Sequence, residues 1–226
     1  MRIAVTLLFA ATLIVVGLLV RPQPATAPVT PAQPHALLPI YERVCTQCHG
    51  AAGEGNSELR SPSIAGQPEW YLEKQLEKFR LGHRGSDPRD ITGQQMRAIA
   101  LTLTDGEADE ATRTISRFES LPTKATMEAD PGRGRQIYEE QCIDCHRYNG
   151  SGEKVFGSSP LTGFQDWYLA AQIDKFRLGI RGYHPEDEKG SQMRHLLSYL
   201  DEGDAEDLAA YIAHLARRYP PDTQRR

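Results

Sequence analysis

The stretches Cys45-Thr46-Gln47-Cys48-His49 and Cys142-Ile143-Asp144-Cys145-His146 decide how this chain folds, and together they contain all four of its cysteines. Two thiols with two residues between them lie one helical turn apart, so both sulfur atoms reach the vinyl groups of one porphyrin. The histidine that follows directly is then placed to bind the porphyrin iron. Each pentapeptide is typical of a covalent attachment site for haem c, and two such haems are expected.

Two other interpretations of the cysteines were weighed against haem attachment. A zinc site built from paired Cys-x-x-Cys knuckles usually has about 15 to 20 residues between its pairs, whereas Cys45 and Cys142 are 97 positions apart. Local disulfides of the thioredoxin kind do not require a histidine after the second cysteine. Zinc and disulfides remain alternatives, but only haem attachment accounts for both histidines.

The chain contains an internal repeat with an offset of 97 residues and no gap. The clearest copies are Trp70-Tyr71-Leu72 with Trp167-Tyr168-Leu169, and Phe79-Arg80-Leu81-Gly82 with Phe176-Arg177-Leu178-Gly179. Such self-similarity indicates that one structural unit has been duplicated. We therefore predict two haem domains, at residues 40–122 and 130–220.

The repeat also indicates the second ligand of each iron, because a ligand used by both haems should occur at both equivalent positions. None of the histidines outside the two motifs has a histidine 97 positions away, whereas Met96 corresponds to Met193. A thioether is a suitable sixth ligand for a low-spin haem, although most methionines only fill gaps in a core. We predict that His49 and Met96 bind one iron and that His146 and Met193 bind the other.

Helix signals run through both repeats, and strand signals are absent. In the second repeat, Asp130 is a plausible N-cap and Pro131 stands at the first helical position. The first repeat has Pro39 where the second has Gln136, so its opening helix is expected to start later and be shorter.

Each repeat is expected to continue with a helix facing the haem and a closing helix. The first of these begins after Pro68 or Gln165 and ends at Gly82 or Gly179, where glycine allows a left-handed turn. The closing helices are announced by Thr104 with Glu107 at capping-box spacing, and by Asp201 or Asp204. In the second repeat, a core stripe of Leu208, Tyr211, Ile212 and Leu215 follows.

With haem motif, helix, methionine loop and closing helix in this order, twice, the chain resembles the class I dihaem cytochromes c, and most closely the cytochrome c4 family, over about residues 36–217. The resemblance implies an all-α fold of two tandem class I cytochrome c domains that face each other about a pseudo-twofold axis. It implies single-electron transfer from a quinol-oxidising complex to a terminal oxidase or reductase, without catalytic residues. The haem-binding residues carried over are Cys45, Cys48, His49 and Met96 for the first haem, and Cys142, Cys145, His146 and Met193 for the second.

The tract around each repeated tryptophan resembles that family's helix facing the haem. It supplies candidates for hydrogen bonds or ion pairs with haem propionates, a role that tunes the reduction potential. These candidates are Trp70, Arg80 and Arg84, and their copies Trp167, Arg177 and Arg181. For the arginines, a solvated helix face is the alternative.

A second functional hypothesis is a dihaem redox enzyme, or the electron-accepting subunit of a small-molecule dehydrogenase. It requires one iron to lose its methionine or to use another ligand. His83, which occurs in the first repeat only, is the residue that breaks the symmetry. Its alternative role is that of a surface histidine.

The N-terminal segment indicates export. An uncharged and largely apolar run from Ile3 to Val20 is long for a signal-peptide core and close to the length that spans a bilayer. Residues 1–20 are therefore expected to be a membrane anchor helix, or alternatively a cleaved signal peptide, and residues 21–39 a proline-rich linker. Either case places the haem domains in the periplasm, and an anchor would hold them at the inner membrane.

The charge balance excludes nucleic acid as a partner. The chain has 26 Lys and Arg against 30 Asp and Glu, a formal net charge of −4. No cationic stripe interleaved with aromatic residues is present. Redox proteins are the expected partners.

Overall fold

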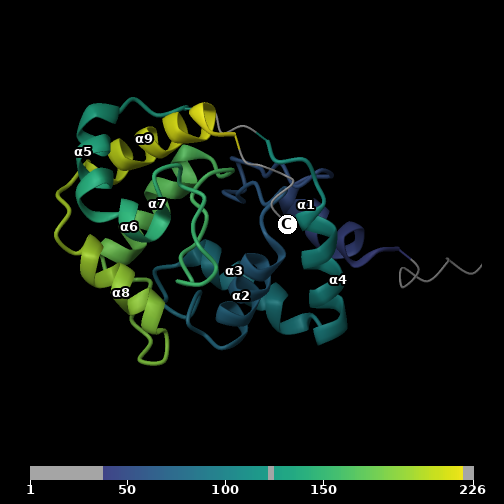
Figure 1. Cartoon of the computed structure of the whole chain (residues 1–226). Coiled ribbons are helices and arrows are strands. Elements are labelled where there is room, and N and C mark those ends of the chain that lie inside the picture. The colour runs from purple at the N-terminus through teal and green to yellow at the C-terminus, as the bar shows by residue number, and fades with distance from the viewer. Residues whose placement is uncertain (1–37, 122–124, 221–226) are drawn as a thin grey trace, which may run out of the picture. The chain divides into compact units, whose positions relative to one another are not determined.

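The computed structural model describes residues 38–121 and 125–220, and these residues are helical throughout with connecting loops (Figure 1). The first repeat contains the π-helix η2 (Tyr41–Cys45) and the α-helices α1 (Thr46–His49), α2 (Glu69–Arg80), α3 (Ile91–Thr102) and α4 (Asp105–Ser116). The second contains α5 (Pro131–Gln141), α6 (Ile143–His146), α7 (Asp166–Arg177), α8 (Glu188–Leu197) and α9 (Asp204–Arg218). Within the described ranges, strand-type pairing is limited to two isolated bridges, Asn56 with Ser61 and Glu153 with Ser158. The predicted all-α class is confirmed.

The two repeats have the same architecture. Helices α1 and α6, and helices α2 and α7, have identical bounds once the offset of 97 residues is applied. The two isolated bridges are related by the same offset. The duplication in the sequence is thus a duplication of structure.

The predicted anchor at residues 1–20 and nearly all of the predicted linker at 21–39 lie outside the described residues. Among the helices of residues 38–121 and 125–220, none has both the length and the hydropathy required to cross a bilayer.

The opening helices differ between the repeats as the prolines predict. In the second repeat, Asp130 caps α5 by accepting a hydrogen bond from the Gly132 N–H at 2.8 Å, and Pro131 is the first helical residue. In the first repeat, the Pro39 carbonyl accepts the Arg43 N–H at 3.2 Å, and the chain winds through η2 directly into α1. Because proline has no N–H to donate to a preceding turn and its ring clashes with that turn, the helix does not extend ahead of Pro39, and the first opening helix is shorter.

The closing helices confirm one predicted cap and correct the other. Helix α4 begins with the capping box of Thr104 and Glu107. The prediction that Asp201 or Asp204 caps α9 is wrong, since the N-cap is Gly203 in a left-handed conformation with φ 92°. The Asp204 carboxylate instead accepts the Asp201 N–H at 3.0 Å and pairs with Arg133.

The two methionine segments are helices, whereas a loop was predicted. Met96 lies in α3 and Met193 in α8. Both helices begin with the same cap: Asp90 accepts the Gly93 N–H at 2.9 Å, and Asp187 accepts that of Gly190 at 3.0 Å. A Cβ atom at either glycine would collide with the capping carboxylate, so Asp-x-x-Gly is the sequence signal that the loop prediction missed.

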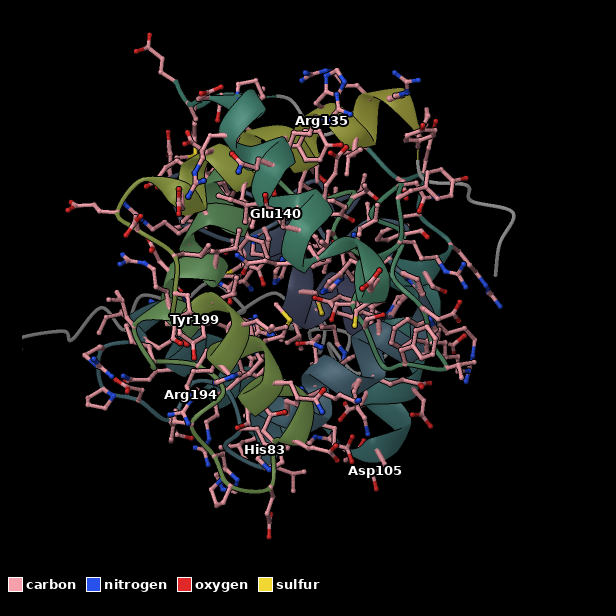
Figure 2. The ribbon with its side chains drawn as sticks, turned by 60° about the vertical axis from the view of Figure 1, so that its left-hand side comes forward. His83, Asp105, Arg135, Glu140, Arg194 and Tyr199 are labelled. Carbon is pink, nitrogen blue, oxygen red and sulfur yellow. The ribbon has the colours of Figure 1, made fainter. Side chains whose placement is uncertain are left out.

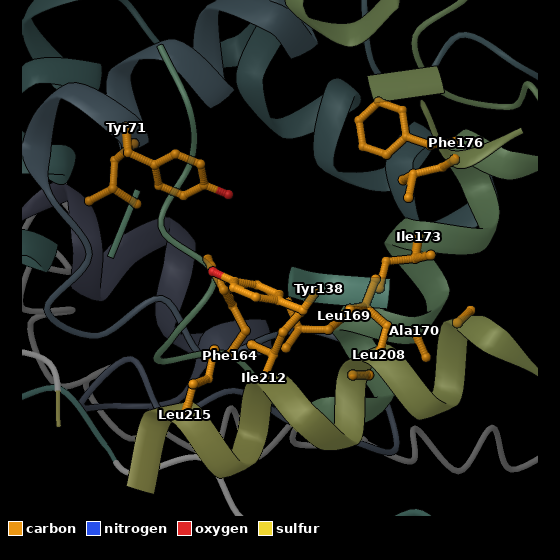
Figure 3. Close-up of a cluster of buried hydrophobic side chains, with 14 of the residues drawn as sticks. Tyr71, Tyr138, Phe164, Leu169, Ala170, Ile173, Phe176, Leu208, Ile212 and Leu215 are labelled. Carbon is orange, nitrogen blue, oxygen red and sulfur yellow. The ribbon is translucent and has the colours of Figure 1, made fainter. Parts of the chain in front are cut away.

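The best-developed core lies where α9 packs on α5 and α7. On α5, Ile137 and Tyr138 are buried, while Arg135 and Glu140 point outward (Figure 2). Figure 3 shows the stripe along α9 that faces this core. Its members Leu208, Ile212 and Leu215 are buried as predicted, and Tyr211 is half-buried.

Asp166, the first residue of α7, binds the segment at Thr126 and Met127 that connects the two repeats. Its carboxylate is fully buried and accepts hydrogen bonds from the backbone N–H and the hydroxyl of Thr126, and from the Met127 and Trp167 N–H groups. Burial alone would raise the pKa of Asp166, but these donors hold it below its ordinary value. The carboxylate therefore stabilises the folded state in its ionised form.

Replacement of Asp166 by Asn is expected to lower the free energy of unfolding by about 2–3 kcal/mol at neutral pH, because several hydrogen bonds to a charged acceptor are lost. Since the folded pKa lies below the unfolded value of about 3.9, the contribution is present above that pH and disappears as the pH falls through the folded pKa. Urea unfolding of the holoprotein at neutral pH and at about pH 3 measures both effects.

The matched control is Glu69→Gln, at the equivalent position of the first repeat. Glu69 forms only a half-exposed ion pair with Arg113 at 3.6 Å, so the expected cost is below about 0.5 kcal/mol. If Asp166→Asn costs no more than this control at neutral pH, the anchoring role is refuted.

Candidate haem sites

The second motif presents an imidazole with one nitrogen free for a metal. Cys142 is the C-cap residue of α5, and Cys145 and His146 lie in the short helix α6. His146 is buried, and its Nδ1 lies 2.8 Å from the Ser159 carbonyl oxygen. Since a carbonyl only accepts, Nδ1 carries the proton, and the lone pair of Nε2 is left available.

The first motif repeats this arrangement. His49 Nδ1 lies 2.9 Å from the carbonyl oxygen of Pro62, the residue equivalent to Ser159. Burial lowers the pKa of both His49 and His146. Both rings are therefore held neutral, the state in which imidazole binds a metal.

A buried tyrosine closes the turn after each motif, a feature that the sequence analysis missed. The Tyr41 hydroxyl donates to the Gly50 carbonyl and the Tyr138 hydroxyl to the Arg147 carbonyl, both at 2.6 Å. The turn requires a positive φ, which is 78° at Gly50 and 64° at Arg147. The occurrence of tyrosine at both equivalent positions was the signal that would have revealed this role.

A cavity of about 400 Å³ adjoins the second motif. Cys142, Cys145 and His146 line it together with Met193 of α8, so the structure brings the predicted ligand set of the second haem together. The remaining lining is largely apolar and includes Ile173, Phe176, Leu197, Leu208 and Ile212. The volume lies in the range of cofactor pockets, about 300–1,000 Å³.

Met96 has the equivalent place in the first repeat. Helix α3, which carries it, packs on α2 just as α8 packs on α7. Met96 and Met193 are both half-buried. The two methionines thus share helix packing and burial class, while the cavity described above places only Met193 next to its motif.

No disulfide joins the four cysteines in the structure, so the geometry does not favour the disulfide alternative. Burial, and after it the neighbouring Cys48, raises the pKa of Cys45 to about 11. Burial and then Cys145 raise that of Cys142 to about 12. The cysteines of the two motifs do not come together as one cluster within the described residues, so the geometry does not favour the zinc alternative.

Two arginines meet between the repeats. Arg84 and Arg181 are buried, and each stacks on an aromatic ring of its own repeat, Phe79 at 4.3 Å and Phe176 at 4.5 Å. Each guanidinium hydrogen-bonds to the side-chain oxygens of both Gln75 and Gln172, at 2.7–3.2 Å. The solvated-face alternative is therefore wrong for Arg84 and Arg181.

No carboxylate hydrogen-bonds directly to either guanidinium in the described part of the chain. The hydrogen-bond acceptors of Arg84 and Arg181 are neutral amide and phenol oxygens, and the buried Nε of Arg84 has no partner. Burial, and then the charge of Arg84, lower the pKa of Arg181 to about 10. Arg181 also lines the cavity next to the second motif. Buried positive charge with an unused donor fits the carboxylates of a haem.

The other propionate candidates lie elsewhere. Arg80 donates to the backbone carbonyls of Ala100, Leu103 and Thr104 and pairs with Asp105. Arg177 pairs with Asp174 within α7. Trp70 and Trp167 are half-buried and pack edge-on against the tyrosines that follow them. A propionate contact from these four residues stays a prediction.

Reciprocal ion pairs join the repeats. Lys78 Nζ lies 2.7 Å from Asp187 Oδ1, and Lys175 Nζ lies 2.6 Å from Asp90 Oδ1. The offset of 97 residues converts one pair into the other. Together with the arginine and glutamine contacts, this reciprocity is what a pseudo-twofold relation requires.

His83 is not the surface residue that the sequence suggested as the alternative. It is 7% exposed, and its ring centroid lies 4.4 Å from that of His184. It is not among the residues that line the cavity at the second motif. The described geometry therefore gives His83 no part in that ligand set.

Comparison with known proteins identifies relatives along most of the chain. A family model described as Cytochrome c matches residues 39–112 and 132–216, one segment in each repeat. The chain is 30% identical over 186 residues to the thiosulfate dehydrogenase electron acceptor of Stutzerimonas stutzeri (strain A1501), covering 77% of this chain and 80% of the relative. It is 31% identical over 185 residues to cytochrome c4 of Stutzerimonas stutzeri, covering 76% and 84%. The crystal structure of reduced recombinant cytochrome c4 from Pseudomonas stutzeri aligns with a TM-score of 0.58 at 29% identity, covering 75% of this chain and 92% of that one.

Proposed function

The chain belongs to the cytochrome c family and is a cytochrome c4-like dihaem electron-transfer protein that binds two haem c groups, and on that premise we propose that it carries single electrons from a quinol-oxidising complex to a terminal oxidase or reductase. We further assign the axial ligands as His49 with Met96 and His146 with Met193. For the second haem, the observation that carries this assignment is one cavity lined by both cysteines and the histidine of the second motif and by Met193. For the first haem, the assignment rests on the equivalence of Met96 and Met193 at the offset of 97 residues.

The bound haem supplies reversible one-electron chemistry at its iron. The protein's contribution is to fix the surroundings. The carbonyls of Pro62 and Ser159 orient the two imidazoles, and the cavity at the second motif offers a largely apolar lining to a haem. Methionine as the sixth ligand raises the reduction potential relative to a second histidine, which suits a carrier at the high-potential end of a respiratory chain.

Arg84 and Arg181 serve in this proposal as the partners of the haem propionates. Their guanidinium groups are buried, and Arg84 retains an unused donor. Their joint network with Gln75 and Gln172 belongs to both repeats. The proposed propionate partners of the two haems are therefore hydrogen-bonded into one network.

A second candidate function is that of electron acceptor for a small-molecule dehydrogenase. The similarity to a thiosulfate dehydrogenase electron acceptor favours it, since the identity of 30% and the coverage of 77% of this chain lie within a few per cent of the values for cytochrome c4. Stopped-flow reduction of the oxidised protein separates the two candidates. Rapid reduction by a quinol-oxidising complex supports the respiratory carrier, whereas rapid reduction by a purified thiosulfate dehydrogenase alone supports the acceptor.

We also propose that the haem domains work on the periplasmic side of the inner membrane, tethered by residues 1–20 through the proline-rich segment 21–39. The apolar run from Ile3 to Val20 supports this. Intact mass of protein extracted from membranes with detergent tests it. An unprocessed chain carrying two haems supports the tether, and a chain lacking the first residues indicates a cleaved signal peptide.

Carbon monoxide binding tests whether both irons are saturated. The reduced protein is expected to leave carbon monoxide unbound, because a histidine and a methionine would hold each iron and leave no position for the gas. The measurement is the visible spectrum of the reduced protein before and after addition of the gas. Uptake by the wild type would show an open iron and would favour a dihaem enzyme.

The positive control is Met193→Ala. Removal of the thioether opens one axial position, so this variant should bind about one carbon monoxide per chain. If the variant takes up no gas either, Met193 is not the ligand that closes the second site.

A further inference from the structure

Three side chains of the types that ligate metals meet at the boundary between the repeats, away from the haem motifs. His83 follows α2 in the first repeat, and His184 and Glu186 precede α8 in the second. One potential ligand atom from each lies within 4.8 Å of the others. Two imidazoles and a carboxylate are a donor set that suits zinc and related divalent transition metals.

The state of His83 points to a missing ligand. Its side chain is buried, and its Nε2 atom has neither a donor nor an acceptor as partner in the described part of the chain. That same atom faces Glu186, at 3.9 Å from its Oε2, which is too far for a hydrogen bond. A buried polar atom normally has a partner, and a cation between the two groups would provide it.

In the second repeat, His184 and Glu186 are already held close together. The Glu186 backbone N–H donates to Nδ1 of His184 at 3.3 Å, so the two residues form one turn. The His184 ring packs against that of His83 with an interplanar angle of 35°. Ligand nitrogens on one tetrahedral zinc ion lie about 3.3 Å apart, so the cluster needs to contract by only about 1.5 Å, which the half-exposed His184 and the exposed Glu186 allow.

The duplication shows that the fold does not require this trio. The positions equivalent to His83, His184 and Glu186 carry Ile180, Asp87 and Arg89. The contacts that join the repeats, by contrast, are matched at the offset of 97 residues, as with Lys78 and Lys175. The cluster is thus a feature of one side of the interface, added to a symmetric framework.

We propose that His83, His184 and Glu186 bind one divalent transition-metal ion, with zinc as the foremost candidate, and that this ion ties the loop after α2 to the loop before α8. Water completes the tetrahedral coordination. The site lies outside both haem ligand sets, which use His49 and His146, and it is independent of the proposed redox partners.

Isothermal titration of the untagged holoprotein with zinc chloride tests the proposal. One zinc ion per chain is expected, with a dissociation constant in the micromolar range. His83→Ala and His184→Ala should each weaken binding by about tenfold or more, and Glu186→Gln by several-fold. Zinc should also raise the thermal unfolding temperature of the wild type but not of the His83 variant.

His214→Asn is the matched control, because His214 is an exposed histidine on α9 outside the cluster, and it should bind zinc as the wild type does. Since His83 is buried, His184→Ala and Glu186→Gln carry the test if His83→Ala fails to fold. Failure of the wild type to bind zinc, or equal loss in the control and the cluster variants, overturns the proposal. An anomalous peak at the zinc edge next to His83 and His184 in a crystal of the holoprotein would establish it.

Discussion

The double variant Cys142→Ser with Cys145→Ser, once purified, is expected to carry one covalently bound haem per chain instead of two. Both sulfur atoms line the cavity at the second motif, and they are the only cysteines of that repeat. Without thioether bonds the haem is no longer held covalently. Intact mass of the purified variant gives the haem count directly.

The same variant should also lose stability in its second repeat. A largely apolar cavity of about 400 Å³ would remain unfilled, and unfilled cavities cost several kcal/mol at about 24 cal/mol per Å³ even when part of the volume opens to water. Cys45→Ser with Cys48→Ser is the matched control, which should lose the other haem. A variant that still carries two covalent haems would contradict the attachment sites.

Replacement of Met193 by His is expected to lower the reduction potential of one haem by roughly 0.1–0.3 V, within the range of about 0.8 V that axial ligands span. A second imidazole stabilises the oxidised iron more than a thioether does. In a spectroelectrochemical titration one of the two one-electron waves should move. Met96→His should move the other wave.

Met127→Leu is the control for this pair, because Met127 lies between the repeats and has no methionine counterpart. Its substitution should leave both waves in place. If Met193→His leaves both potentials unchanged, Met193 is only a core residue, as the alternative in the sequence analysis held.

Much of the fold and of the haem sites could be predicted from the sequence, because the internal repeat allows equivalent positions to be compared within one chain. The offset of 97 residues selected Met96 and Met193 among all candidate ligands, and the structure places Met193 in one cavity with the second motif. Caps at Asp130 and Thr104 were found because they depend on a few adjacent residues. Such local signals do not need knowledge of the tertiary fold.

The contacts between the two repeats were not predicted from the sequence because they depend on the tertiary fold. No local sequence pattern predicts that Lys78 forms an ion pair with Asp187 or that Arg84 is buried. The duplication nevertheless held a clue, since Gln75, Arg84 and their copies all match at the same offset. The asymmetric His83 carried no such clue, and its burial against His184 follows only from the way in which the repeats pack.

The most direct test of the central claim is the near-infrared spectrum of the oxidised holoprotein, in which ligation of iron by methionine gives a sulfur-to-iron charge-transfer band. Two low-spin haems per chain are expected, with a band amplitude that falls by half in Met193→His and vanishes when Met96→His is added. A wild-type spectrum without this band, or with one high-spin iron, would contradict ligation by histidine and methionine at both sites.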